Sequence, residues 1–226
     1  MLRAIIFDFD GTILDSETHE YHSWLEIYQA YNAQLPLEVW LQVVGTVSTE
    51  FDPHRHLEEQ VQQTLDRATL REQRRQRFME LIDREPLLPG VVELIAAARE
   101  AGLRLGVASS GTRDWVEGHL IGRGLRHSFS VVRTSADVSR VKPDPELYLS
   151  AAAGLGVDPH NAVAIEDSRH GLVAAKAAGM KCVVVPNSIT AGLDFSASDL
   201  VVPSLHQVTI GQVAALWTTS NHGLDG

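Results

Sequence analysis

The chain has 226 residues, of which 44% are hydrophobic and 21% are charged, and its formal net charge at pH 7 is −10. This composition is typical of a globular protein and excludes disordered, collagen-like and fibrous classes. An acidic surface also argues against binding to nucleic acid or to an anionic membrane.

The N-terminal third predicts one strand followed only by helices. Residues 4–7 form a short apolar run that ends at an aspartate, which is typical of a buried parallel strand. Apolar residues spaced by three and four predict a helix over residues 16–33, with Ser16 as its N-cap. A further short helix begins at Pro36, and the charged segment 57–82 predicts one long helix.

A linker with two prolines and a glycine, residues 85–90, precedes a regular alternation of helices and strands. The expected strands are residues 105–108, 129–132, 162–165, 182–185 and 200–202. The expected helices are residues 91–101, 113–121, 145–153, 172–178 and 210–217. This alternation predicts an α/β fold with a doubly wound, parallel, Rossmann-like sheet.

The first strand is isolated from the others in the sequence. Because roughly 75 residues of helix separate it from the second strand, we expect an inserted α-helical domain. The α/β core domain then comprises residues 1–15 and 87–226, and the inserted domain comprises residues 16–86.

The single cysteine and the apolar runs indicate the compartment. Cys182 cannot form an internal disulfide, and we interpret it as a buried core thiol. No stretch approaches the ~18 apolar residues that a membrane span needs. Aspartates interrupt the apolar start of the chain, so we expect no signal peptide. We therefore expect a reduced, cytoplasmic protein with no membrane partner, and we expect a monomer.

Acidic and polar side chains follow the expected strands. In chain order they are Asp8, Asp10, Ser109, Ser110, Glu166 and Asp167, with Lys142 in the loop before the helix at 145–153. The carboxyl ends of parallel strands meet at one edge of an open sheet, where ligands bind. Acids gathered there need neutralisation, and oxygen ligands without His or Cys suit Mg²⁺. The sequence therefore predicts a magnesium site at this edge.

Four segments of the chain carry a family resemblance. They are, in order, FDFDGTILDSE, VASSG, VKPDP and AIEDS. With these motifs the chain resembles the haloacid dehalogenase-like hydrolase superfamily over nearly its whole length. The inserted domain looks like the small helical cap of the phosphatase and β-phosphoglucomutase branch. The resemblance implies a cap domain, an aspartyl-phosphate intermediate, Mg²⁺ as cofactor and a small phosphorylated metabolite as substrate.

The resemblance also implies roles for the residues at the strand ends. Asp8 is expected to be the nucleophile, and Asp10 the general acid that later activates water as a base. Ser109 is expected to bind a phosphoryl oxygen, together with backbone N–H groups around Ser110. Lys142 is expected to neutralise that oxygen and the nucleophile.

The same resemblance implies the metal ligands. They are the carboxylate of Asp8, the backbone carbonyl of Asp10 and Asp167, with Glu166 as a further acid in or beside the coordination shell. Each of these residues also has a structural interpretation. The two aspartates of the first motif could form a turn, and Glu166 and Asp167 could be N-terminal acids of a helix.

Ser109 and Lys142 also have structural alternatives. Ser109 could cap the helix that begins near residue 113. Lys142 could be a solvated loop lysine.

The reaction class is left with alternatives. Asp10, which the dehalogenases of this superfamily lack, disfavours dehalogenation. The sugar phosphomutases that resemble this chain carry a histidine in the first cap helix, where this sequence has Glu20 flanked by His19 and His22. We predict a phosphatase, because it needs only water on the aspartyl-phosphate. A sugar phosphomutase is the alternative, and a non-catalytic binding module is the third hypothesis.

The inserted domain is expected to decide the substrate. His54, Arg55 and His56 are cationic candidates for binding a second anionic group of the substrate. The basic run at residues 71–77 is interpreted as a solvated helix face. Hinges that let the cap open and close are expected near residues 15–16 and 86–89.

Overall fold

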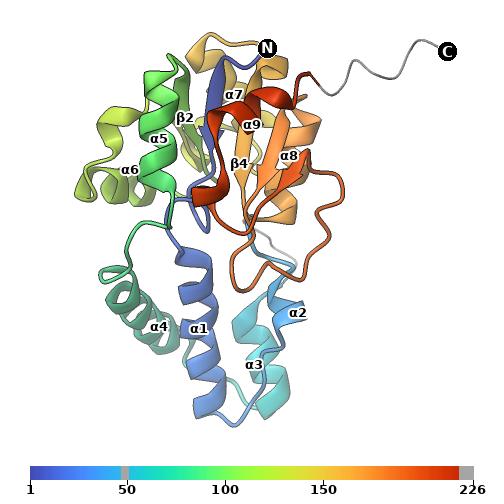
Figure 1. The fold of residues 1–226 in the computed structure, drawn as a ribbon. Helices are drawn as coiled ribbons and strands as arrows, with labels where there is room; N and C mark the ends of the chain where they lie inside the picture. Colours follow the sequence, from blue (N-terminus) through green and yellow to red (C-terminus); the bar gives the residue numbers. More distant parts are fainter. Residues whose placement is uncertain (47–50, 219–226) are drawn as a thin grey trace, which may run out of the picture.

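The structure is a computed structural model and describes residues 1–46 and 51–218. Its centre is a parallel sheet with the strand order β3-β2-β1-β4-β5-β6 (Figure 1). The strands are β1 (Ala4–Phe7), β2 (Arg104–Ala108), β3 (Val131–Arg133), β4 (Ala162–Glu166), β5 (Lys181–Val184) and β6 (Leu200–Val201). The first strand of the chain thus lies in the middle of the sheet. The residues that follow it occupy the switch point, where ligands bind in open α/β sheets.

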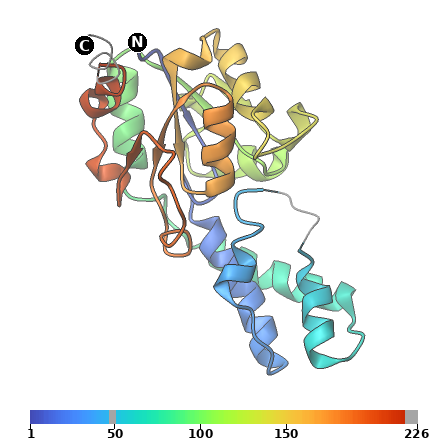
Figure 2. The same ribbon diagram turned by 90° about the vertical axis from the view of Figure 1, so that its right-hand side faces the viewer.

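Helices cover both faces of this sheet (Figure 2). One face packs against α5 (Val91–Glu100), α6 (Arg113–Gly122) and α9 (Ile210–Ala215), and the other against α7 (Glu146–Leu155) and α8 (Arg169–Ala177). Strand β1 contributes side chains to the hydrophobic cores on both faces, because successive strand residues point to opposite faces of the sheet. Ile5 and Phe7 belong to the first core, and Ala4 and Ile6 to the second. All of β1 is therefore buried, which explains its uninterrupted apolar run.

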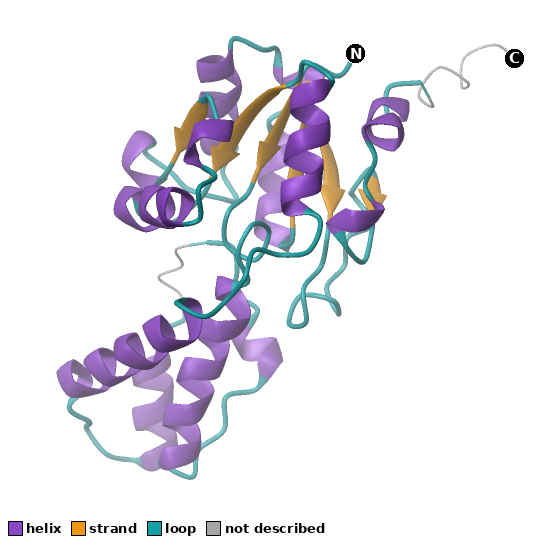
Figure 3. Ribbon diagram, turned by 60° about the vertical axis from the view of Figure 1, so that its left-hand side comes forward, coloured by secondary structure: helices purple, strands orange, loops and turns teal. Residues whose placement is uncertain are grey.

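A second group of helices, here called the helical part, lies beyond the sheet. It comprises α1 (Ser16–Ala30), α2 (Leu37–Trp40), α3 (Pro53–Val61) and α4 (Arg67–Ile82). These helices share a hydrophobic core of their own that contains Trp24, Tyr28, Trp40 and Leu57. The strand arrows in Figure 3 point toward the helical part, so the carboxyl edge of the sheet faces it.

The prediction of a single long helix over residues 57–82 is wrong, because the structure has two helices there, α3 and α4. Helix α3 ends at Gln62, whose backbone is left-handed with φ of 51°. Asp66 then caps α4 by accepting the backbone N–H groups of Ala68 and Thr69 at 3.1 Å. The break therefore comes from local backbone geometry and a capping carboxylate, with no glycine or proline to mark it.

The predicted N-cap of the first helix is also one residue displaced. Asp15 caps α1 by accepting the backbone N–H of Thr18 at 3.3 Å. The hydroxyl of Ser16 instead donates a hydrogen bond of 2.6 Å to Asp10.

Strand β3 begins at Val131, two residues later than predicted. Within the described part of the chain, the helices are too short or too polar to cross a membrane.

Candidate active site

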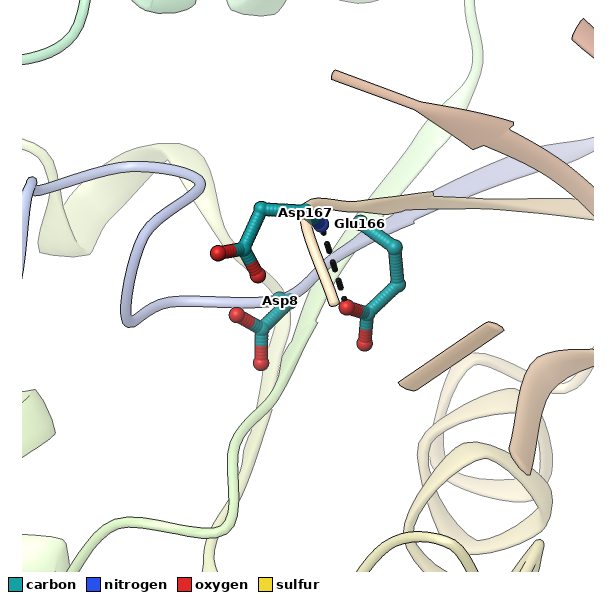
Figure 4. A group of neighbouring side chains, drawn as sticks. All are labelled: Asp8, Glu166 and Asp167. Carbon is teal, nitrogen blue, oxygen red and sulfur yellow. Dashed lines mark hydrogen bonds between the residues drawn. The ribbon is translucent and has the colours of Figure 1, made fainter. Parts of the chain in front are cut away.

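Three buried carboxylates converge at the ends of β1 and β4 (Figure 4). One carboxylate oxygen from each of Asp8, Glu166 and Asp167 lies within 4.8 Å of the others. The residues are only 6%, 0% and 1% exposed, respectively. They meet because β1 and β4 are parallel neighbours with Phe7 beside Ile165, so both strands end at the same height.

Lys142 supplies a buried positive charge to this cluster. Its Nζ atom donates a hydrogen bond to Oδ1 of Asp8 and another, of 2.7 Å, to Oε1 of Glu166. Burial alone would lower the pKa of Lys142, but the charges of Asp8 and Glu166 outweigh it and raise that pKa. The side chain is 1% exposed, so the alternative of a solvated loop lysine is wrong.

One lysine does not balance three acids. Burial raises the pKa of Asp8 to about 8 against the opposing charge of Lys142. Burial, with the charges of Asp8 and Glu166, raises the pKa of Asp167 well above its usual range. Further positive charge would let these carboxylates ionise. A cluster of buried carboxylate oxygens is the donor set that Mg²⁺ prefers, so the residues present fit this ion.

Three residues outside the predicted set shape the acid cluster. The Nδ2 atom of Asn187 donates to Oδ2 of Asp167 at 2.7 Å, and the hydroxyl of Tyr148 donates to Oε1 of Glu166 at 2.6 Å. Gly11 has φ of +78°, and a Cβ atom there would lie 2.1 Å from Oδ2 of Asp167. Asn187 follows β5 at the same sheet edge, and this position was the signal that could have identified it.

The carboxylate of Asp10 accepts hydrogen bonds from residues of three different segments. Ser16 Oγ and Trp115 Nε1 donate to its Oδ1 at 2.6 and 2.8 Å, and Ser109 Oγ donates to its Oδ2 at 3.2 Å. Thr112, not Ser109, caps α6. The structural interpretation of Ser109 as a helix cap is therefore wrong, and its hydroxyl faces the carboxylate instead.

A cavity of about 790 Å³ extends from this sheet edge to the helical part. On the side of the sheet it is lined by Asp8, Asp10, Ser110 and Trp115 among others. On the opposite side it is lined by Glu17, Glu20, Arg74, Arg75 and Phe78. The cavity thus gives a small molecule access to the acidic edge.

Gly45 and Thr46, which follow α2 in the chain, line one side of the cavity. The hydroxyl of Thr46 donates to the backbone carbonyl of Lys142, and the hydroxyl of Ser110 donates to the carbonyl of Gly45 at 3.3 Å. The backbone N–H of Gly45 donates to Glu17 at 3.1 Å. These bonds connect the helical part directly to two of the predicted site residues.

The structure brings all the predicted site residues of the core to one edge of the sheet. They are Asp8, Asp10, Ser109, Ser110, Lys142, Glu166 and Asp167. The cationic candidates of the inserted domain are not part of this group. Of the described residues, His54, Arg55 and His56 lie outside the cavity lining. His54 packs on Trp24 with ring centroids 4.7 Å apart, and His56 contacts the hydroxyl of Tyr28 at 2.9 Å.

Comparisons with known proteins agree on one family. The model of haloacid dehalogenase-like hydrolases matches residues 5–185. The chain is 47% identical to the putative phosphatase YhcW of Bacillus subtilis, over 93% of this chain and 95% of that protein. It is 35% identical to hexitol phosphatase B of Escherichia coli, over 82% of this chain and 84% of that protein.

A solved structure gives a similar result. The crystal structure of CbbY from Rhodobacter sphaeroides in complex with xylulose 1,5-bisphosphate superposes with a TM-score of 0.69. The two sequences are 29% identical, and the match covers 92% of this chain and 96% of that one.

Proposed function

Because this chain belongs to the haloacid dehalogenase-like hydrolase family and is a phosphatase, we propose that it hydrolyses a small phosphorylated metabolite through an aspartyl-phosphate on Asp8, with Mg²⁺ as cofactor. The placement of Asp8 carries this proposal. Its carboxylate accepts a hydrogen bond from Lys142, belongs to the cluster with Asp167 and Glu166, and lines the cavity. Phosphoryl transfer requires such a nucleophile beside groups that neutralise charge.

In the first step, the carboxylate oxygen of Asp8 attacks phosphorus and the phosphoester bond breaks. Asp10 gives its proton to the leaving oxygen. In the second step, Asp10 takes a proton from water, whose oxygen attacks phosphorus, and Asp8 and inorganic phosphate are released. Ser109 and Lys142 hold the phosphoryl oxygens through hydrogen bonds. Asp8, the Asp10 carbonyl and Asp167 would hold Mg²⁺, which would supply charge neutralisation.

The contacts of the first helix favour hydrolysis over phosphomutase chemistry. Glu20 lines the cavity and pairs with Arg74 at 3.2 Å. The neighbouring His19 lies 2.6 Å from Glu85, and His22 is exposed. Among the described residues of the helical part, no histidine therefore lines the cavity. The imidazole that the mutase resemblance calls for is replaced by a carboxylate.

The substrate class we propose is a sugar or polyol phosphate. A relative is named hexitol phosphatase B, and the structure of CbbY holds a sugar bisphosphate. Glu17 and Glu20 place carboxylate acceptors on the cavity wall, where they suit the hydroxyl groups of such a substrate. Residues 16–86 would act as the cap over it. The free, buried thiol of Cys182 suits the cytoplasmic location that we propose for a monomeric enzyme.

The test is turnover of p-nitrophenyl phosphate with Mg²⁺. Asp8→Asn should abolish it in a protein that still folds, whereas Asp194→Asn, at an exposed position, should keep it. Activity retained in Asp8→Asn would refute the assignment of Asp8 as the nucleophile. A screen of sugar and polyol phosphates then tests the substrate class. Conversion of β-glucose 1-phosphate to glucose 6-phosphate with a bisphosphate primer, without release of phosphate, would favour the mutase.

A further inference from the structure

Trp115 connects the acidic sheet edge to the helical part. Its Nε1 atom donates to Oδ1 of Asp10 at 2.8 Å. Its ring stacks on that of Phe78, with centroids 5.4 Å apart and an interplanar angle of 30°. Trp115 lies in the first turn of α6 and Phe78 lies on α4. Helix α6 belongs to the core and α4 to the helical part (Figure 1), so the stack joins the two. Both side chains line the cavity.

The indole is held in this orientation by its surroundings. His119, one turn later on α6, packs edge-on against it with ring centroids 4.0 Å apart. The backbone N–H of Trp115 donates to the capping hydroxyl of Thr112 at 3.4 Å. Gly111 leaves the space that the ring occupies, since a Cβ atom there would lie 3.2 Å from both Cδ1 of Trp115 and Oδ2 of Asp10.

The other donor to the same oxygen of Asp10 is less constrained. It is the hydroxyl of Ser16, whose proton can rotate toward another acceptor. The indole N–H lies in the plane of a ring that packs against Phe78 and His119, so these contacts fix its direction and thereby the direction of the carboxylate. Side-chain displacements of about 1 Å can lower a catalytic rate by about 100-fold. An ordered donor at this atom therefore matters for catalysis.

We propose that Trp115 is a positioning residue that orients the Asp10 carboxylate toward the leaving oxygen of the phosphoester, and that Phe78 keeps the indole in place while α4 packs on the core. The inference rests on the proposed function, in which Asp10 protonates that oxygen. It extends that function by giving the cap a route to the proton donor. Contact between α4 and the core would order Trp115, and Trp115 would order Asp10.

A pair of substrates that differ in leaving group tests the proposal. Phenyl phosphate and p-nitrophenyl phosphate have similar shapes, but phenolate is the poorer leaving group and depends more on protonation. Trp115→Phe keeps the aromatic ring and removes the N–H group. We expect it to lower kcat/KM about 30-fold for phenyl phosphate and less than about threefold for p-nitrophenyl phosphate, with Mg²⁺ present.

Two further variants separate the parts of the proposal. Phe78→Leu keeps the indole N–H but removes the stack. Like Trp115→Phe, it should lower kcat/KM more for phenyl phosphate than for p-nitrophenyl phosphate. Trp217→Phe is the matched control, because the Nε1 atom of Trp217 donates to the carbonyl of His160 at 2.7 Å, outside the cavity lining. It should change neither kcat/KM value.

The outcomes are distinguishable. An equal loss on both substrates in Trp115→Phe would overturn the positioning role, because general damage to the fold or the pocket does not depend on the leaving group. No loss on either substrate would overturn it as well. If Trp115→Phe does not fold, the same comparison in Phe78→Leu decides. A wild-type protein that hydrolyses neither ester, or an active Asp8→Asn variant, would instead refute the proposed function itself.

Discussion

The ammonium group of Lys142 lies 2.7 Å from a carboxylate oxygen of Glu166, and the two side chains are only 1% and 0% exposed. The same ammonium group donates a hydrogen bond to Asp8, so one buried cation pairs with two carboxylates at the ends of β1 and β4. Removing one partner of such a buried group leaves uncompensated charge in a medium of low dielectric constant. Both the stability of this region and the proposed chemistry therefore depend on Lys142.

Lys142→Met should destabilise the metal-free protein. Loss of the cation leaves Asp8 and Glu166 facing each other, and we expect the free energy of unfolding to fall by about 3–5 kcal/mol. Urea denaturation in EDTA measures this. The control is Lys181→Met, where Lys176 still pairs with Asp199 at 2.6 Å. If Lys142→Met were as stable as this control, the buried ion pair would not have the importance assigned to it.

Asp167→Asn should have opposite effects on stability and on metal binding. The substitution removes a buried acid whose ionisation is opposed by burial and by the charges of Asp8 and Glu166, so the metal-free variant should be at least as stable as the wild type. In the wild type, Mg²⁺ at about 100 times its Kd should stabilise the fold by about 2.7 kcal/mol. Thermal denaturation with and without Mg²⁺ should show this gain lost in Asp167→Asn and kept in Asp194→Asn. A full gain in Asp167→Asn would argue against Asp167 as a ligand.

The metal-free protein should become less stable as the pH rises. Burial raises the pKa of Asp8 from 3.8 to about 8, so between these values the folded state binds more protons than the unfolded state. The stabilising contribution is complete below the lower value and is lost as the pH passes the upper one. Melting temperatures in EDTA should therefore fall from pH 5 to pH 9 relative to those of Asp8→Asn. Parallel curves for the two proteins would contradict the assigned pKa.

Glu20→Ala should change substrate affinity more than stability. The pair with Arg74 is partly exposed, so its loss should cost no more than about 1 kcal/mol. A hydrogen bond from a substrate hydroxyl to this carboxylate would be worth about 1.5–3 kcal/mol, so KM for a sugar phosphate should rise about 10-fold or more. KM for p-nitrophenyl phosphate, which has no hydroxyl groups, should stay within about twofold.

Glu26→Ala is the control for that substitution, because Glu26 is exposed on the same helix and pairs with Arg77 away from the cavity. Both KM values should be unchanged in this variant. An equal rise for the two substrates in Glu20→Ala would mean that Glu20 shapes the pocket without recognising hydroxyl groups.

The sequence predicted the parts of the fold that depend on local pattern. The apolar run at residues 4–7 indicated a buried strand because both faces of the sheet are covered. The expected site residues of the core lie together because strand ends in a parallel sheet share an edge. The break after α3 was missed because Gln62, a residue that rarely adopts a left-handed backbone, ends that helix.

The remaining features of the site depend on tertiary packing. Trp115 reaches Asp10 across 105 positions of the chain, and Asn187 reaches Asp167 across 20, without a motif that links either pair. The predicted role of His54 was wrong for the same reason. The sequence left the direction of its side chain open, and in the structure that side chain packs on Trp24 and lies outside the cavity lining.

The central claim is that the carboxylate of Asp8 carries the phosphoryl group. The most direct measurement is rapid quenching of the enzyme during turnover with Mg²⁺, followed by borohydride reduction and peptide mass spectrometry. Reduction converts an aspartyl-phosphate to homoserine, so the conversion should occur at residue 8 and should be absent when substrate is left out. Turnover with no conversion at residue 8, or with conversion at another aspartate, would contradict the account.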